Sequence, residues 1–190
     1  MGKFLEAITP EIADFIAAQH LFFTATAPLE KEGHINLSPK GMDSFRVLGP
    51  QKVGYMDVIS SGNETSAHTR QNGRITFMFC SFAEKAKIVR LYGKGYAVTR
   101  LHPEWPALSE HFTLLPSTRQ IIVAHIHLVQ TSCGFGVPQY AFLGHRGLHE
   151  QWAQQKGPVG LHAYMEKNNL QSIDGLPTDI GAEWPITPPA

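Results

Sequence analysis

Short runs of β-branched and aromatic residues, separated by turn residues, recur between residues 21 and 131 and limit what this chain can fold into. Many short strands close together are typical of an antiparallel barrel or sandwich, whereas strands that alternate with long helices would indicate a parallel sheet. The sequence therefore predicts a mainly β protein with added helices. The predicted strands are 21–27, 35–37, 45–48, 53–58, 74–80, 88–92, 96–99 and 120–131.

Helices are predicted around and within this β-rich region. Thr9-Pro10-Glu11 is a good helix start, with Thr9 as the N-cap and proline at the first helical position. A polar helix is expected at 64–71, a short one within 102–112, and two amphipathic ones at 148–155 and 161–168. The Gly-, Pro- and Asp-rich residues 174–190 are expected to form an irregular surface arm.

Composition excludes several classes of protein. Hydrophobic residues make up 43% and charged residues 17% of the 190 residues, which is typical of one globular domain. Sixteen basic and sixteen acidic side chains cancel, so we expect neither nucleic acid nor an anionic membrane as the partner. No stretch is long and apolar enough to span a membrane, and no secretory signal is visible. We expect a cytoplasmic protein.

A polar face is predicted in the segment His34 to Gly41, HINLSPKG. Successive side chains of a strand point to opposite faces, so the polar side chains at alternate positions share one face. This face is either a polar wall of a ligand site or the solvated face of an edge strand. The residues that share it are His34, Asn36, Ser38 and Lys40.

The stretch Ser60 to Thr65, SSGNET, immediately precedes the predicted polar helix. Ser61-Gly-Asn-Glu64 fits a capping box, in which Ser61 accepts an amide hydrogen bond and Glu64 reaches back. The same helix start could hold an anion, because its first amides and the neighbouring hydroxyls are donors. Glu64 would repel a phosphate there. The sequence leaves both interpretations open.

Two histidines of the last predicted strand, His125 and His127, lie two residues apart and therefore on one face. No acid or cysteine nearby completes a ligand set, so we predict no metal site. Basic residues flank the glycine-containing segment RLYGKG, which we expect to be a turn between two strands. Arg90 and Lys94 there are candidates for phosphate partners.

The segment Cys133-Gly-Phe-Gly-Val-Pro138 follows the last predicted strand. Two glycines on either side of an aromatic residue, followed by proline, indicate a sharp turn. The alternative is that this segment lines a ligand site. Cys133 lacks the neighbouring His and Asn or Asp that are expected of a nucleophilic cysteine. No Walker, GxGxxG, HExxH or GxSxG motif is present either.

In order and spacing, these segments resemble the pyridoxamine 5′-phosphate oxidase-like FMN-binding split-barrel family. The similar segments are FFTATA, HINLSPKG, VGYMDVISSGNET, RITFMFC, IVRLYGKG and CGFGVP. They are most similar to an oxidase-related branch whose substrate is unassigned. The resemblance implies a homodimer of six-stranded antiparallel split β-barrels, with FMN at the subunit interface. Residues 1–145 would form the FMN-binding domain, and residues 146–190 a helical extension and arm of the same domain.

The resemblance also implies which residues hold the cofactor. Lys40 would meet the phosphate or the ring edge, and three residues of the helix start would bond the phosphate. The backbone at Val58 and Ile59 would face the ring, and Cys133 and Gly134 would approach it from the partner subunit. The implied cofactor-binding residues are Asn36, Ser38, Lys40, Val58, Ile59, Ser60, Ser61, Asn63, Thr65, Cys133 and Gly134.

The sequence departs from the family where its oxidases carry an arginine-lysine pair, because this chain has Asn63-Glu64-Thr65 there. It also lacks their basic, tryptophan-bearing C-terminal end. We therefore expect an FMN-dependent oxidoreductase of unassigned small-molecule substrate, with NAD(P)H as a candidate donor, and no true pyridoxamine phosphate oxidase activity. The sequence identifies no catalytic residue.

Two other classes of function remain open on the same fold. One is a non-catalytic flavin- or haem-binding or stress-related protein, for which a haem would need His34, His125 or His127. The other is a deazaflavin-dependent reductase. The absorption spectrum of the purified protein would distinguish flavin from haem.

Overall fold

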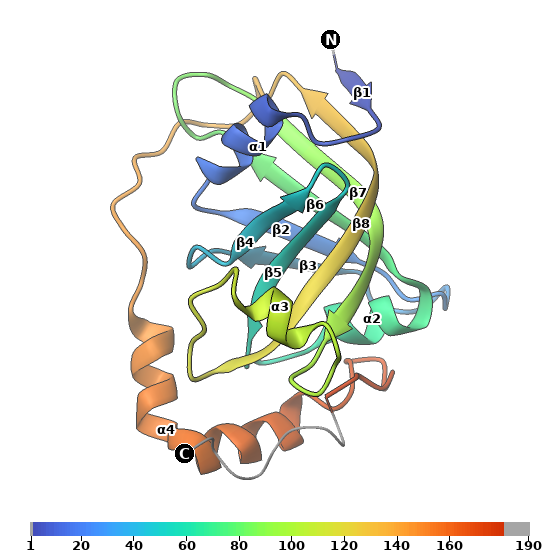
Figure 1. Cartoon of the computed structure of the whole chain (residues 1–190), viewed down its shortest axis with the longest axis vertical. Coiled ribbons are helices and arrows are strands. Elements are labelled where there is room, and N and C mark those ends of the chain that lie inside the picture. The colour runs from blue at the N-terminus through green and yellow to red at the C-terminus, as the bar shows by residue number, and fades with distance from the viewer. Residues whose placement is uncertain (1, 181–190) are drawn as a thin grey trace.

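One antiparallel sheet of eight strands forms the centre of the molecule (Figure 1). The structure is a computed structural model, and residues 2–180 are described. The strands are β1 Lys3–Leu5, β2 Phe22–Thr26, β3 Asn36–Lys40, β4 Phe45–Gly49, β5 Lys52–Val58, β6 Arg74–Cys80, β7 Ile88–Val98 and β8 Thr118–Ser132. Their order is β3-β2-β6-β7-β8-β5-β4, and β1 also pairs with β8. The helices are α1 Pro10–Ala17, α2 Glu64–Asn72, α3 Trp105–Ser109 and α4 Leu148–Asn168.

The mainly β character with added helices is confirmed, but the six-stranded barrel is corrected to an open sheet of eight strands. The two ends of the sheet, β3 and β4, do not pair with each other in the described part of the chain. The sheet is nevertheless strongly curved. Its curvature is shown by Phe22 of β2, which contacts aromatic rings of β4 and β5 from the opposite end of the sheet. The Phe22 ring centroid lies 4.9 Å from that of Phe45 and 5.6 Å from that of Tyr55. Both ends therefore share one apolar core.

The predicted runs of residues correspond to β2–β8, with one correction in β7, whereas the short strand β1 was not predicted. The runs 88–92 and 96–99 are two parts of this single strand, so the predicted turn at RLYGKG is wrong. Its glycines serve close strand packing instead: a Cβ on Gly93 would lie 2.6 Å from the carbonyl oxygen of His125 in β8. The pairing of β7 with β8 has an irregularity between Tyr92 and Gly93. Glycine is required here by proximity and not by a turn.

The helices begin and end largely where the sequence predicts. Thr9 caps α1 by accepting a hydrogen bond from the Ile12 amide, and Ile12 and Ile16 face the core. The two helices predicted near the C-terminus form the two parts of α4, which breaks at Gly157 with φ 62° and ψ 175°. The buried face of α4 packs on Ile59 and Ile180.

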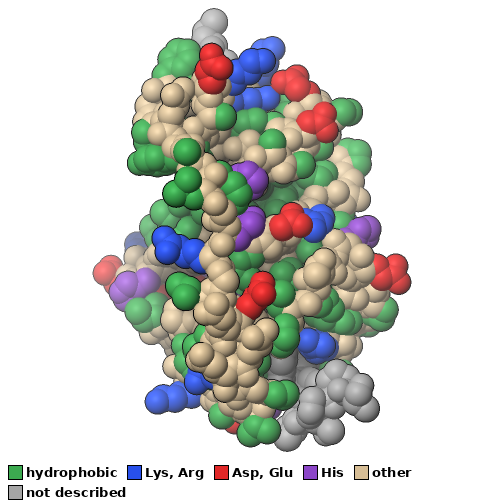
Figure 2. All heavy atoms as spheres, turned by 90° about the vertical axis from the view of Figure 1, so that its left-hand side faces the viewer, with side chains coloured by type: hydrophobic (Ala, Val, Ile, Leu, Met, Phe, Trp, Pro, Cys, Tyr) green, Lys and Arg blue, Asp and Glu red, His purple; other side chains and the backbone are tan. Residues whose placement is uncertain are grey.

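Residues 133–147 connect β8 to α4 as an extended, largely exposed stretch along one side of the molecule (Figure 1). Figure 2 looks directly onto this side, where the connection runs down the middle of the surface. Phe142 of the connection stacks on His20 with ring centroids 3.6 Å apart. The connection thus brings α4 back to the far end of the sheet, next to the start of α2.

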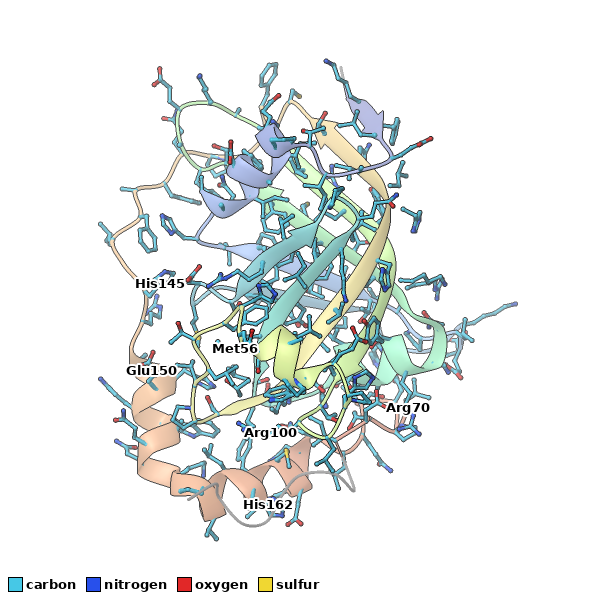
Figure 3. All side chains as sticks on the ribbon, in the orientation of Figure 1. Met56, Arg70, Arg100, His145, Glu150 and His162 are labelled. Carbon is cyan, nitrogen blue, oxygen red and sulfur yellow. The ribbon has the colours of Figure 1, made fainter. Side chains whose placement is uncertain are left out.

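The C-terminal segment, residues 169–180, follows α4 and packs against α2. Arg70 of α2 points toward it in Figure 3 and forms an ion pair of 2.9 Å with Asp179. Ile180 and Thr178 are buried. The irregular arm predicted for 174–190 is therefore a packed part of the fold as far as residue 180, and its remainder lies outside the described residues.

Candidate functional site

A polar cavity of about 450 Å³ lies where β3, the start of α2 and the C-terminal segment meet. Seven of the eleven residues predicted to bind a cofactor line it: Asn36, Ser38, Lys40, Ser60, Ser61, Asn63 and Thr65. Glu64, Arg119 and residues of the C-terminal segment complete the walls. The volume is within the range of about 300–1,000 Å³ that is typical of small-molecule sites.

The strand β3 supplies one wall through its alternation. Asn36, Ser38 and Lys40 face the cavity, and Asn36 donates hydrogen bonds to the hydroxyls of Thr26 and Thr65, at 3.0 and 3.1 Å. His34, the fourth polar residue predicted on this face, does not line the cavity. Its imidazole is exposed and pairs with Asp174. The interpretation of β3 as a polar wall therefore accounts for three of the four residues.

The start of α2 supplies a second wall, but the predicted capping box does not form. The helix begins at Glu64 with Asn63 as the N-cap residue, and Asn63 makes no side-chain capping bond. The Asn63 side chain instead accepts from Gln120 Nε2 at 2.8 Å and donates to the Asn169 carbonyl at 3.2 Å. These buried partners fix Asn63, so the helix start faces the cavity without a side-chain cap.

A cluster of charged side chains lies beneath the cavity. Asp57 of β5 accepts a 2.8 Å bond from Arg119 Nε and a 3.1 Å bond from Lys40 Nζ. Gln120 Nε2 donates to the same carboxylate at 2.8 Å. Burial raises the pKa of Asp57, but the charges of Arg119 and Lys40 with these hydrogen bonds outweigh it and hold the pKa well below its usual range. Asp57 is therefore ionised and fixes both cations.

Sequence analysis missed Arg119, as well as the cavity-lining residues at the end of α4 and in the C-terminal segment. The Arg119 side chain is 2% exposed, Nε binds Asp57, and Nη1 donates to Asn169 Oδ1 at 2.7 Å. Nη2 has no hydrogen-bond partner among the described residues, and Arg119 lines the cavity. A guanidinium nitrogen that has no protein partner in a polar cavity is expected to bind an anion or water. The available signal for Arg119 was a charged residue at the start of an otherwise apolar buried strand.

Glu64, the acid that would oppose an anion here, is held by the C-terminal segment. Its two carboxylate oxygens each lie 3.2 Å from the amide nitrogen of Ile173, which donates to them. The carboxylate therefore faces the end of the cavity formed by the C-terminal segment. This arrangement removes part of the repulsion that the sequence predicted at the helix start.

A second cavity of about 250 Å³ adjoins the first and shares Ser38, Lys40 and Ser60 with it. Its other walls are less polar and include Met42, Met56 and Val58. Met42 and the next residue, Asp43, have φ of 63° and 50°, in the left-handed region that such side chains rarely adopt. Backbone strain of this kind often occurs at functional sites. We name this second space the methionine cavity.

The remaining predicted site residues do not lie in the polar cavity. Ile59 is buried against α4, and its amide and carbonyl already bond Ser117 and His149, so its backbone is not free to face a ligand. Cys133 and Gly134 lie beyond the opposite end of β8, where Gly134 packs on the backbone of Lys87. Within this chain the structure therefore does not bring them to the site.

Other candidates from the sequence also lie elsewhere. Arg90 bonds Ser132, and Lys94 bonds the Asn72 carbonyl. His125 and His127 are exposed on β8. Between residues 2 and 180, no group of three or more metal-binding side chains is close enough to hold an ion. The same residues contain no helix long and apolar enough to cross a bilayer.

Comparisons with known proteins identify the family. The pyridoxamine 5′-phosphate oxidase family protein ustO of Aspergillus flavus is 42% identical over an alignment of 196 residues, which covers 93% of this chain and 78% of ustO. The chain therefore belongs to the pyridoxamine 5′-phosphate oxidase family. No protein-family model matches it.

Solved structures show the same fold at low sequence identity. A variant of HupZ from Group A Streptococcus superposes with a TM-score of 0.53 and 20% identity, over 66% of this chain and 99% of HupZ. A Clostridium acetobutylicum protein related to general stress protein 26 gives a TM-score of 0.50 at 11% identity, over 65% of this chain and 86% of that protein.

Proposed function

We propose that this protein is an FMN-binding flavoprotein that acts as an FMN-dependent oxidoreductase. The observation that carries the proposal is the unpartnered Nη2 of Arg119, a buried cation beside the uncapped start of α2 in one cavity. Membership of the pyridoxamine 5′-phosphate oxidase family supports a flavin as the ligand. Helix N-termini and guanidinium groups are both favourable partners for a phosphate.

The donor chemistry of the polar cavity fits the phosphate and ribityl chain of FMN. Arg119, the hydroxyl of Ser61 and the first amides of α2 would hold the phosphate. Asn36 and Ser38 carry polar groups suited to ribityl hydroxyls. Lys40 and Arg119 share one carboxylate, so this cluster keeps one net positive charge for an anion.

The methionine cavity fits the flat ring. It joins the polar cavity at Ser38, Lys40 and Ser60, and Met42, Met56 and Val58 offer apolar surface. Methionine side chains pack well against aromatic rings. The predicted role of Val58 beside the ring is retained in this proposal, although Ile59 is not part of it. Bound FMN would supply the redox chemistry, while these residues orient the ring and exclude water.

We propose no catalytic acid or base. Asp57, the buried carboxylate closest to the two cavities, is fully engaged by two cations and a glutamine. The substrate is a small molecule other than pyridoxamine 5′-phosphate, because Glu64 places a negative charge where the family's oxidases hold cations. NAD(P)H is the proposed electron donor to be tested.

We further propose that the protein is a homodimer. On the face of the sheet opposite the polar cavity, the strand register places one largely apolar row of side chains: Leu37, Ala25, Thr76 and Tyr92. Leu37 of the edge strand β3 is 65% exposed, and Ile35, just before this strand, is 77% exposed. An apolar surface on a sheet face of this kind marks an interface, and a second copy is the occupant that the family favours.

A non-catalytic flavin carrier is the second candidate. It is favoured by one observation: the charged side chains nearest the methionine cavity, Asp57 and Lys40, are paired with each other. Haem binding has less support than flavin binding. His34 is paired with Asp174, and His125 and His127 do not line the polar cavity.

Titration of the purified full-length protein with FMN tests the proposal. We expect quenching of flavin fluorescence, flavin absorption bands at ~450 and ~370 nm, and bleaching of the ~450 nm band by NAD(P)H in the absence of oxygen. Bound FMN that dithionite but not NAD(P)H reduces would favour the carrier or another donor. A protein that binds no FMN, or that purifies with a Soret band, would overturn the flavin proposal.

A further inference from the structure

We infer that the C-terminal segment closes the phosphate end of the polar cavity and so selects a mononucleotide over a dinucleotide, with Asn169 as the positioning residue. The inference rests on the proposed function, because it concerns which flavin the site accepts. Residues Asn168, Gln171, Ser172 and Ile173 line the polar cavity but not the methionine cavity. They therefore form the end of the polar cavity away from the proposed ring position.

A dinucleotide would need space beyond the first phosphate. In FAD, a second phosphate and an adenosine extend from the phosphate that FMN carries. With the first phosphate at Arg119 and the start of α2, this extension would run into Ser172 and Ile173. The segment would have to move for FAD to bind, whereas FMN ends where the wall begins.

The wall is fixed in place by Asn169. This residue is 0% exposed, and its Nδ2 donates to the Ser60 carbonyl at 2.8 Å. Its Oδ1 accepts from Arg119 Nη1 at 2.7 Å, and its carbonyl accepts from Asn63 Nδ2 at 3.2 Å. This buried residue thus ties the segment to three residues of the cavity wall, two through its side chain and one through its carbonyl. Displacing it would leave buried polar groups unpaired, which is costly.

Further contacts make the segment a wall and not a mobile lid. Thr178 Oγ1 donates to the Asn169 carbonyl at 2.7 Å. Ile180, 1% exposed, packs with Ile59 and with Met165 of α4. The segment is therefore held by apolar burial as well as by hydrogen bonds, and opening it would expose part of this core.

The charges at this end of the cavity also favour a mononucleotide over a dinucleotide. The carboxylate of Glu64 lies against the Ile173 amide, and Asp174 follows immediately. Asp174 itself pairs with His34. A second phosphate would approach the carboxylate of Glu64, which lines this end of the cavity and would repel it, whereas a single phosphate at Arg119 lies on the cationic side.

A ligand series on the full-length protein tests the inference. We expect FMN to bind about tenfold or more tightly than riboflavin, because the phosphate gains charge-assisted hydrogen bonds. We also expect FMN to bind about tenfold or more tightly than FAD. Equal affinity for FMN and FAD would overturn the inference and leave the proposed flavin function standing. If no flavin binds, the proposed function and this inference fail together.

The variant Asn169→Ala tests the assignment to this residue. We expect weaker FMN binding and a fall in the FMN-to-FAD affinity ratio of about tenfold, since a loosened wall admits the longer ligand. General destabilisation would weaken both ligands alike and leave the ratio unchanged. Glu166→Gln is the matched control, because Glu166 pairs with His162 on α4, has no other ion pair among residues 2–180 and does not line the cavity. A folded Asn169→Ala protein with the wild-type ratio would overturn the assignment.

Discussion

Arg119 Nε donates a 2.8 Å hydrogen bond to Asp57 Oδ2, and both side chains are 2% exposed. The pair joins two adjacent antiparallel strands, β5 and β8, at the edge of the polar cavity. Lys40 reaches the other oxygen of the same carboxylate from β3. Three strands therefore meet at one buried acid, and the cavity depends on this meeting point.

Replacing Asp57 by asparagine should strongly destabilise the protein. The change leaves the buried charge of Arg119 without its counter-ion, so we expect a loss of about 3–5 kcal/mol in the free energy of unfolding. Urea denaturation without ligand measures it. The control is Asp43→Asn: this carboxylate is 81% exposed, and its ion pair with Arg46 should contribute about 1 kcal/mol or less. Equal effects of the two changes would contradict the proposed importance of the buried pair.

Removing positive charge from the polar cavity, or adding negative charge, should weaken FMN binding. We expect Lys40→Ala and Asn63→Asp each to raise the Kd for FMN by about tenfold or more, since one removes a cation and the other adds a repelling carboxylate. Fluorescence titration measures this. The exposed Lys31, which does not line the cavity, provides the control variant Lys31→Ala.

Both cavity residues also have structural partners, so the unfolding of each variant should be measured without FMN. Lys40 pairs with Asp57, and Asn63 bonds Gln120. Unchanged affinity in both folded variants would mean that the phosphate binds elsewhere.

A charge on the outer face of β3 should disrupt the proposed homodimer. Leu37→Lys places a cation in the apolar row that a second copy would cover, and its burial in an interface is unfavourable. We expect light scattering during size-exclusion chromatography to show a dimer for the wild type and a monomer for this variant. Val159→Lys on α4, where Val159 is 79% exposed, should remain dimeric. A monomeric wild type, or a dimeric Leu37→Lys variant, would contradict the interface.

The contact between His34 and Asp174 should make stability depend on pH in a defined direction. A hydrogen bond from the imidazole to Asp174, and the charge of this carboxylate, raise the pKa of His34 above 6.5. The charged imidazolium is therefore favoured in the folded state. Its contribution is fully present below pH 6.5, while Asp174 stays ionised, and is lost as the pH rises through the raised pKa.

The variant His34→Asn measures this contribution. We expect the difference in Tm between wild type and variant to be larger at pH ~6 than at pH ~9. His127→Asn is the control, because His127 is exposed and has no charged partner in the described part of the chain. A difference that does not change with pH would show that the pair contributes nothing through its charge.

Local patterns in the sequence determined much of the fold. Alternation and β-branched runs gave the strands and placed Asn36, Ser38 and Lys40 on one face of β3, because the side-chain period of a strand is a local property. Thr9-Pro10 gave the start of α1 for the same reason. The order of the motifs pointed to the family, which the comparison with ustO confirms.

Only the tertiary structure decided how these parts make a site. Asp57 and Arg119 are 62 residues apart in sequence, and the pairing of β5 with β8 brings them together. Asn169, a further 50 residues on, binds Arg119 through the packing of α4. The capping box at Ser61 failed because buried long-range partners fix Asn63, and Glu64 turned to the Ile173 amide. Local propensity cannot predict such contacts, since burial far along the chain determines which partner each polar group finds.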